Sequence, residues 1–169
     1  MTDRQLQDLL DKQAIYEVLA RYTRGVDRLD REMILSCYHP DAFDDHGGYQ
    51  GTAEGHVDWS FEVLAPFKLS NHRLGNLLID IQGDTAYSEC YVLPYLAGND
   101  ADGASTHQYF ILRFIDRFER RSGGPWLIAH RVLSFDWNRI DPVEVGRALT
   151  DDYIVGRRDK QDPVYQRPS

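Results

Sequence analysis

An aspartate at the end of an amphipathic helix is the first residue of this sequence that suggests chemistry. Apolar residues recur at helical spacing over residues 12–26, so a helix is expected there with Asp27 at its carboxyl end. The negative end of the helix dipole opposes a carboxylate by about 0.3–1 kcal/mol at an exposed position, so Asp27 needs a cationic or hydrogen-bonding partner. His72, on a later strand-like segment, is the best candidate, although a histidine on a strand is more often a core or surface residue.

An arginine interrupts an otherwise apolar row near the end of the chain. In a strand over residues 126–140, alternate positions read Leu127, Ala129, Arg131, Leu133, Phe135 and Trp137. Burying an unpaired guanidinium costs several kcal/mol, so Arg131 implies a buried anionic or carbonyl partner and could act on a reacting group. The alternatives are that its charged end reaches solvent at a sheet edge, or that this face is an oligomer interface.

Tyr22 belongs to the apolar stripe of the helix that precedes Asp27. Such a tyrosine is usually a core residue, but its hydroxyl needs a partner when buried and could polarise the oxygen of a ligand. Other aromatic and polar side chains could line a pocket, and these are Tyr16, Tyr49, Trp59, Asn76, Tyr91, His107 and Tyr109.

A run of possible metal ligands follows the second predicted helix. It contains His39, Asp41, Asp44, Asp45 and His46, but their order matches no standard zinc or calcium pattern, and residues of a solvated turn are the better interpretation. The sequence also has no phosphate-binding glycine loop, nucleophile elbow or dinucleotide fingerprint. We therefore expect neither a cofactor nor a metal.

Periodic patterns place helices in the first half of the chain and strands in the second. Helical spacing starts at Leu6 and continues to residue 26, and Asp30 and Thr52 can cap two further helices. Strand-like segments are expected over residues 42–49, 69–82, 85–97, 105–120 and 126–140. This order predicts an α+β fold, a cone-shaped α+β barrel in which three amino-terminal helices pack on a strongly curved, mainly antiparallel sheet. A cone of this kind has an apolar interior that suits a small hydrophobic substrate.

The domain is expected to span residues 1–140, and residues 141–169 form a polar, proline-containing tail that packs over the domain or over a partner subunit. The sheet offers more apolar face than three short helices can cover, and an exposed face of that size usually marks an interface. We therefore expect a homodimer or homotrimer.

Composition limits the possible partners. The chain has 169 residues, 42% of them hydrophobic, which suits one domain with a substantial core. Its 27 acidic and 19 basic residues give a formal charge of −8, and the basic residues are scattered, which argues against nucleic acid as a partner.

No basic leader with an apolar core and no stretch of membrane-spanning length is visible, so a cytoplasmic protein without membrane contact is expected. Cys37 and Cys90 are too few for a disulfide framework and are expected to be buried free thiols.

The segments RYTRGVDRLDREMILSCYHPDAF and SNHRLGN, with the order of helices and strands, resemble the SnoaL-like branch of the nuclear transport factor 2-like superfamily. Members of this branch include scytalone dehydratase, bile acid 7α-dehydratase and hexachlorocyclohexane dehydrochlorinase, which are cofactor-free eliminating enzymes. In these enzymes an aspartate at the end of the first helix pairs with a histidine on the first long strand, and the matching residues are Asp27 and His72. The resemblance also matches the arginine of the dehydrochlorinase to Arg131 and the tyrosine of the bile acid dehydratase to Tyr22.

The resemblance implies a histidine base that is oriented by an aspartate. Asp27 would fix the tautomer of His72 and stabilise its imidazolium, while His72 removes a proton beside an electron-withdrawing group. Tyr22 or Arg131 would stabilise the developing enolate or leaving oxygen. The expected reaction is a dehydratase-like elimination on a hydrophobic cyclic hydroxy-ketone of polyketide or steroid type. Two alternatives stay open: a ketosteroid-isomerase-like double-bond shift, and a non-catalytic ligand-binding or scaffold domain.

Overall fold

The computed structural model describes residues 2–99, 103–143 and 150–166. Its helices are α1 (Asp3–Arg28), α2 (Arg31–Leu35) and α3 (Ala53–Leu64), with short 3-10 turns η1 (Arg121–Gly123) and η2 (Pro163–Tyr165). Its strands are β1 (Tyr38–Asp45), β2 (Gln50–Thr52), β3 (Phe67–Gln82), β4 (Thr85–Asn99), β5 (Ser105–Arg120) and β6 (Trp126–Pro142). The predicted order of three helices followed by a strand meander is therefore confirmed.

Side-chain caps fix where the helices begin. Thr2 and Gln5 form a capping box at the start of α1. Asp30 and Thr52 each accept a hydrogen bond from the backbone N–H three residues later, as predicted, and a cap of this kind contributes about 1 kcal/mol. Helix α1 ends at Arg28, because the following residue, Leu29, adopts a left-handed conformation with φ of 52°. Asp27 therefore lies in the last turn of α1, where the sequence placed it.

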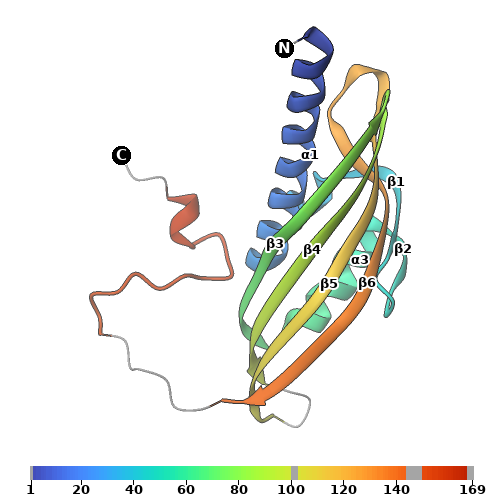
Figure 1. Ribbon diagram of the computed structural model, residues 1–169. Coiled ribbons are helices and arrows are strands. Elements are labelled where there is room, and N and C mark those ends of the chain that lie inside the picture. The colour runs from blue at the N-terminus through green and yellow to red at the C-terminus, as the bar shows by residue number, and fades with distance from the viewer. Residues whose placement is uncertain (1, 100–102, 144–149, 167–169) are drawn as a thin grey trace.

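The described strands form one curved, open sheet in the order β2-β1-β6-β5-β4-β3. All neighbouring strands are antiparallel except β1 and β6, which pair in parallel. The four long strands run side by side as a twisted surface, with α1 along one side of it and α3 behind its lower half (Figure 1). The α+β prediction is confirmed, and the concave face of the sheet together with the helices makes the cone.

Cross-strand register divides the side chains of the sheet between an inner and an outer face. The inner face carries rows such as Leu77, Cys90, Phe114 and Leu133, which pack against the helices. The outer face exposes large apolar side chains along the same strands, and these are Leu78, Tyr87, Tyr91, Leu93, Tyr109, Ile115 and Trp137. This exposed apolar surface is the feature from which self-association was predicted.

The apolar row expected on β6 does not share one face. The pairing of β5 with β6 shifts register twice, which inserts Ala129 and Asp136 as extra residues in β6. Beyond each bulge, the alternation of inward-facing and outward-facing side chains along β6 is reversed. Arg131, Leu133 and Phe135 therefore face inward, whereas Leu127 and Trp137 face outward. Strict alternation along β6 was the wrong assumption.

The described part of the carboxyl-terminal segment contacts the end of α1. Arg158 donates hydrogen bonds to the backbone carbonyls of Asp27 (3.2 Å), Leu64 (3.0 Å) and Phe67 (2.6 Å). Asp30 binds the Lys160 ammonium (2.5 Å) and the hydroxyl of Tyr165 (2.8 Å). One arginine therefore joins the ends of α1 and α3 and the start of β3.

Cys37 and Cys90 are free and buried, as expected. Over residues 2–99, 103–143 and 150–166, no helix is both long enough and apolar enough to span a membrane.

Candidate active site

Asp27 and His72 are in direct contact. Nδ1 of His72 lies 2.7 Å from Oδ1 of Asp27. The carboxylate also accepts hydrogen bonds from the Ser70 hydroxyl (2.8 Å) and from the backbone N–H of His72 (3.0 Å to Oδ2). A carboxylate only accepts hydrogen bonds, so Nδ1 of His72 carries a hydrogen and Nε2 is the nitrogen available as a base. These donors supply the partners that Asp27 needs at the negative end of α1.

His72 faces an apolar cavity of about 110 Å³ between the inner sheet face and the helices. Tyr22 from α1, Trp59 from α3 and Phe114 from β5 contribute to its walls. A wider hollow of about 550 Å³ lies on the opposite side, over Leu78 and neighbouring residues of the outer face, away from His72. The smaller cavity is the better candidate for a substrate site, because its apolar wall includes Tyr22, His56 and the carboxylate-bound His72.

Tyr22 projects its hydroxyl toward a second histidine in the cavity wall. Its Oη lies 2.9 Å from Nε2 of His56, which is almost completely buried. Burial raises the pKa of Tyr22, although the charge of Arg131 opposes this, so the hydroxyl keeps its proton at neutral pH. Tyr22 is therefore both a core residue and a polar group of the cavity.

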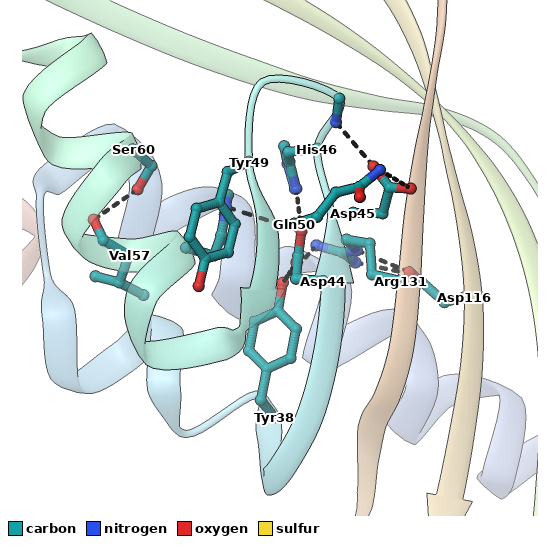
Figure 2. Close-up of polar contacts among 12 residues, drawn as sticks. Tyr38, Asp44, Asp45, His46, Tyr49, Gln50, Val57, Ser60, Asp116 and Arg131 are labelled. Carbon is teal, nitrogen blue, oxygen red and sulfur yellow. Dashed lines mark hydrogen bonds and ion pairs between the residues drawn. The ribbon is translucent and has the colours of Figure 1, made fainter.

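A second aspartate–histidine pair lies in the same wall. The side chain of Asp44, at 0% exposure, binds Nδ1 of His46 and accepts a hydrogen bond of 2.6 Å from the hydroxyl of Tyr38. Figure 2 shows both groups directed at Asp44. The ring of His46 also stacks on His56, with centroids 3.9 Å apart. The expectation that residues 39–46 form a solvated turn was therefore wrong for Asp44, because β1 pairs with β6 and turns this side chain inward.

The charges of this wall are set by burial and by the neighbouring cations. Burial on its own would raise the pKa of Asp44, but the hydrogen bond and charge of His46, with His56 and Arg131, lower it to about 2. Burial lowers the pKa of His56 to about 3, and His46 acts in the same direction. At neutral pH the wall therefore contains an ionised Asp44 beside a neutral His56.

Arg131 is fully buried and has the anionic partner that its position implied. Its Nε and Nη2 atoms each lie 2.7 Å from a carboxylate oxygen of Asp116, and Figure 2 shows this two-pronged pair. Its guanidinium also lies over the rings of Tyr22 (4.2 Å to the centroid) and Phe114 (3.9 Å). Solvent exposure at an edge and an interface role are both excluded for this side chain. Its expected direct contact with substrate is not supported either, because Tyr22 and Phe114 stand between it and the cavity.

Residues 7–132 match the family of SnoaL-like domains. The chain belongs to this family. The Mycobacterium tuberculosis protein Rv2910c is 28% identical over 130 residues, which cover 74% of this chain and 85% of that protein. The structure of LinA is 25% identical with a TM-score of 0.70, and the match covers 86% of this chain and 99% of LinA. A Novosphingobium aromaticivorans protein named after scytalone dehydratase shares the fold, with 15% identity, a TM-score of 0.68 and coverage of 88% and 97%.

The residues expected to line a pocket lie in different parts of this SnoaL-like domain. Trp59 lines the cavity, and Tyr49 stacks behind it with ring centroids 6.1 Å apart. The other expected residues lie elsewhere: Tyr16 is exposed on α1, Asn76 is exposed at a bulge of β3, and Tyr91, His107 and Tyr109 are on the outer sheet face. Aromatic character alone could not separate the two faces, because both carry aromatic residues.

The residues that the sequence did not select are His56 and the pairing of Asp44 with His46. A pattern signal existed for the pair, since residues two apart on a strand point to the same face. His56 lies on α3 among Val57 and Ser60, where its position on the buried side of that helix could have singled it out. Arg131 and Asp116 could not be paired from the sequence, because the bulges of β6 set their register.

The grouping of Asp44, His46 and His56 also raises the question of a metal site. One potential ligand atom from each lies within 4.8 Å of the other two. Asp44 and His46 are hydrogen-bonded to each other, however, and the two imidazole rings stack at 25° instead of converging on a common point. This geometry fits a hydrogen-bonded pair better than a metal centre.

Proposed function

We propose that this protein is a lyase that eliminates water or another small group from a hydrophobic cyclic substrate by proton transfer. The observation that carries the proposal is the contact of 2.7 Å between Asp27 and His72 at the edge of an apolar cavity. A histidine oriented by a carboxylate and facing a water-poor site is suited to remove a proton next to a carbonyl group. Membership of the SnoaL-like family and the similarity to LinA, a hexachlorocyclohexane dehydrochlorinase, support this class of reaction.

Four side chains have roles around the substrate in this proposal. Nε2 of His72 takes the proton, and Asp27 stabilises the imidazolium that results. The hydroxyl of Tyr22 donates a hydrogen bond to the enolate oxygen, and His56 holds that hydroxyl in place. Arg131 acts through the ring of Tyr22 and is a positioning residue.

The cavity volume favours a smaller substrate than the sequence suggested. An apolar cavity of about 150 Å³ accommodates benzene. At about 110 Å³, this cavity is no larger than that one, so it favours a single six-membered ring over a polycyclic steroid-like molecule. A cyclic β-hydroxyketone with one ring is therefore the substrate class that we propose.

A direct test uses 3-hydroxycyclohexanone, whose elimination gives an enone that absorbs in the ultraviolet. Wild-type protein should form the enone and should exchange the hydrogens next to the carbonyl for deuterium in heavy water. His72→Gln should lose both activities, and His130→Gln, on the outer sheet face, should lose neither. Enone formation that does not depend on His72 would contradict the proposal.

We propose further that the reaction needs no cofactor. Turnover should survive exhaustive dialysis against a chelator and should require no nicotinamide, flavin or added metal. If chelation abolished turnover and a divalent ion restored it, Asp44, His46 and His56 would instead be a metal centre.

The competing proposal is a ligand-binding or scaffold domain in which Asp27 and His72 form a structural ion pair. It predicts that cyclohexanone binds in the cavity, seen by line broadening in NMR spectra, without deuterium exchange. Exchange that depends on His72 would exclude this alternative. A third possibility, a double-bond shift, would appear as conversion of 3-cyclohexenone to its conjugated isomer.

Self-association remains a proposal that the exposed outer face supports. Leu78, at 74% exposure, and Ile115, at 42%, lie in one cross-strand row over the wider hollow. A homodimer or homotrimer that buries this face should be visible by sedimentation at micromolar concentration. Leu78→Lys should weaken it, and a wild-type monomer at these concentrations would contradict it.

A further inference from the structure

Two histidines with carboxylate partners face the same cavity, and the proposed function uses only one of them. His72 is held by Asp27, and His46 is held by Asp44. Both imidazoles belong to the wall of the cavity of about 110 Å³. In each pair the carboxylate takes Nδ1, so Nε2 is the nitrogen that a bound molecule can meet.

The surroundings of His46 fix the position of its ring. Tyr38 anchors the other oxygen of Asp44 at 2.6 Å, and the ring of His56 covers one face of His46. The titratable and charged groups that face His46 are Asp44 and His56, with the Arg131–Asp116 pair behind them. Arg131 pairs with Asp116, so the imidazole in direct contact with Asp44 is that of His46.

Among the residues that the structure describes, no atom hydrogen-bonds Nδ1 of His56, although this atom is buried 3.8 Å from Oδ1 of Asp44. His56 therefore contributes a ring contact and a partner for Tyr22, and of the two stacked histidines it is His46 that hydrogen-bonds Asp44. This division leaves His46 as the proton-bearing group on its side of the cavity.

We propose that His46, oriented by Asp44, is the general acid that protonates the departing oxygen. The proposal rests on the proposed function of His72 as the base, and it divides one elimination between two histidines. Asp44 is a positioning residue, because it acts through His46.

The step balances without a cofactor. His72 takes the proton from the carbon next to the carbonyl, and the electrons of that bond form the enolate. The carbon–carbon double bond then forms as the bond to the β-oxygen breaks. The leaving hydroxide takes the proton of His46 and departs as water. His72 then gives its extra proton to solvent, and His46 takes a proton from solvent, so both residues return to their starting states.

The experiment compares two leaving groups on one ring. Hydroxide is a poor leaving group and needs the acid, whereas acetate leaves without one. We use 3-hydroxycyclohexanone and 3-acetoxycyclohexanone as probes, with deuterium exchange next to the carbonyl as a third readout. The variants are His46→Gln, Asp44→Asn and His72→Gln, and His130→Gln is the matched control on the outer face.

If His46 is the acid, His46→Gln should lower turnover of the hydroxy probe by roughly 10²–10⁴-fold, the usual contribution of a positioned acid. The same variant should eliminate acetate within about fivefold of wild type and should keep deuterium exchange, which also shows that it is folded. Asp44→Asn should show the same selectivity with a smaller loss. His72→Gln should lose all three activities.

Two results with His46→Gln overturn the assignment: equal losses on both probes, which would make His46 structural, and full activity on the hydroxy probe. A wild-type protein that performs neither elimination nor exchange defeats the proposed function itself, and the acid role with it. Nitrogen NMR of wild type adds a test that needs no variant. The assignment requires hydrogen on both ring nitrogens of His46 at the pH of the assay, and a bare Nε2 overturns it.

Discussion

The two aspartate–histidine pairs of this protein use the same side chains in different surroundings. Asp27 and His72 come from a helix end and a distant strand, and the carboxylate is held mainly by backbone and hydroxyl donors. Asp44 and His46 come from one short stretch of chain, and Asp44 is enclosed with the buried Arg131 network. The first pair can therefore be altered with little effect on folding, whereas the second is part of what holds the core together.

The largest expected effect concerns the first pair. Asp27→Asn and His72→Ala should each lower kcat/KM by roughly 10²–10⁴-fold, because each removes the oriented base. The double variant should be little worse than either single variant, since the two residues act as a unit. Kinetics on 3-hydroxycyclohexanone measure this, with circular dichroism as the folding control. Losses that multiply in the double variant would show that the two side chains act independently.

The next effect tests the charge network behind the second pair. Arg131→Met should lower the free energy of unfolding by roughly 3–5 kcal/mol, because it leaves Asp116 buried without a counter-ion. Both side chains of this ion pair are fully buried, so the remaining carboxylate cannot reach solvent. Urea denaturation measures the loss, and Arg131→Met combined with Asp116→Leu should recover much of it. A stable single variant would mean that Asp116 is not held as a buried charge.

A matched pair of substitutions compares the two carboxylates directly. Asp44→Asn should cost about 1–3 kcal/mol more than Asp27→Asn, because Asp44 is fully enclosed and an amide leaves a buried group unsatisfied. Urea denaturation of both variants at one pH gives the difference. Equal costs would remove the distinction between a separable pair and a structural pair.

The last effect concerns pH, and it amounts to at most about 1.4 kcal/mol for each pH unit. His56 has a pKa of about 3 in the folded protein against an ordinary value of 6.5, so between these values the unfolded chain binds a proton that the folded chain does not. Stability from this histidine is complete above pH 6.5 and declines as the pH falls toward 3, by at most about 1.4 kcal/mol per pH unit. Denaturation at several pH values should show a shallower slope for His56→Gln than for His72→Gln. Identical slopes would contradict the assignment of a neutral, buried His56.

Sequence patterns predicted the elements of the fold and the need of Asp27 for a partner, because caps, periodicity and the misplaced carboxylate are local signals, and the family resemblance pointed to His72 as that partner. They did not predict which residues meet inside the cone. The bulges at Ala129 and Asp136 depend on pairing with β5, and they decide that Arg131 faces Asp116. Asp44 appeared to be a turn residue because its burial depends on the parallel contact of β1 with β6. Non-local register was therefore the missing information, and it affected the pocket lining most.

Arg158 lets the carboxyl-terminal segment hold the end of α1 in place. Its guanidinium donates hydrogen bonds to the backbone carbonyls of Asp27, Leu64 and Phe67. Arg158 itself lies outside residues 7–132, which match the family. A chain trimmed to the family bounds would lose these hydrogen bonds, and the last turn of α1 would then fray beside the carboxylate of Asp27. Cleavage by a protease near residue 150 is therefore expected to loosen the end of α1 while leaving the residues of both histidine pairs intact.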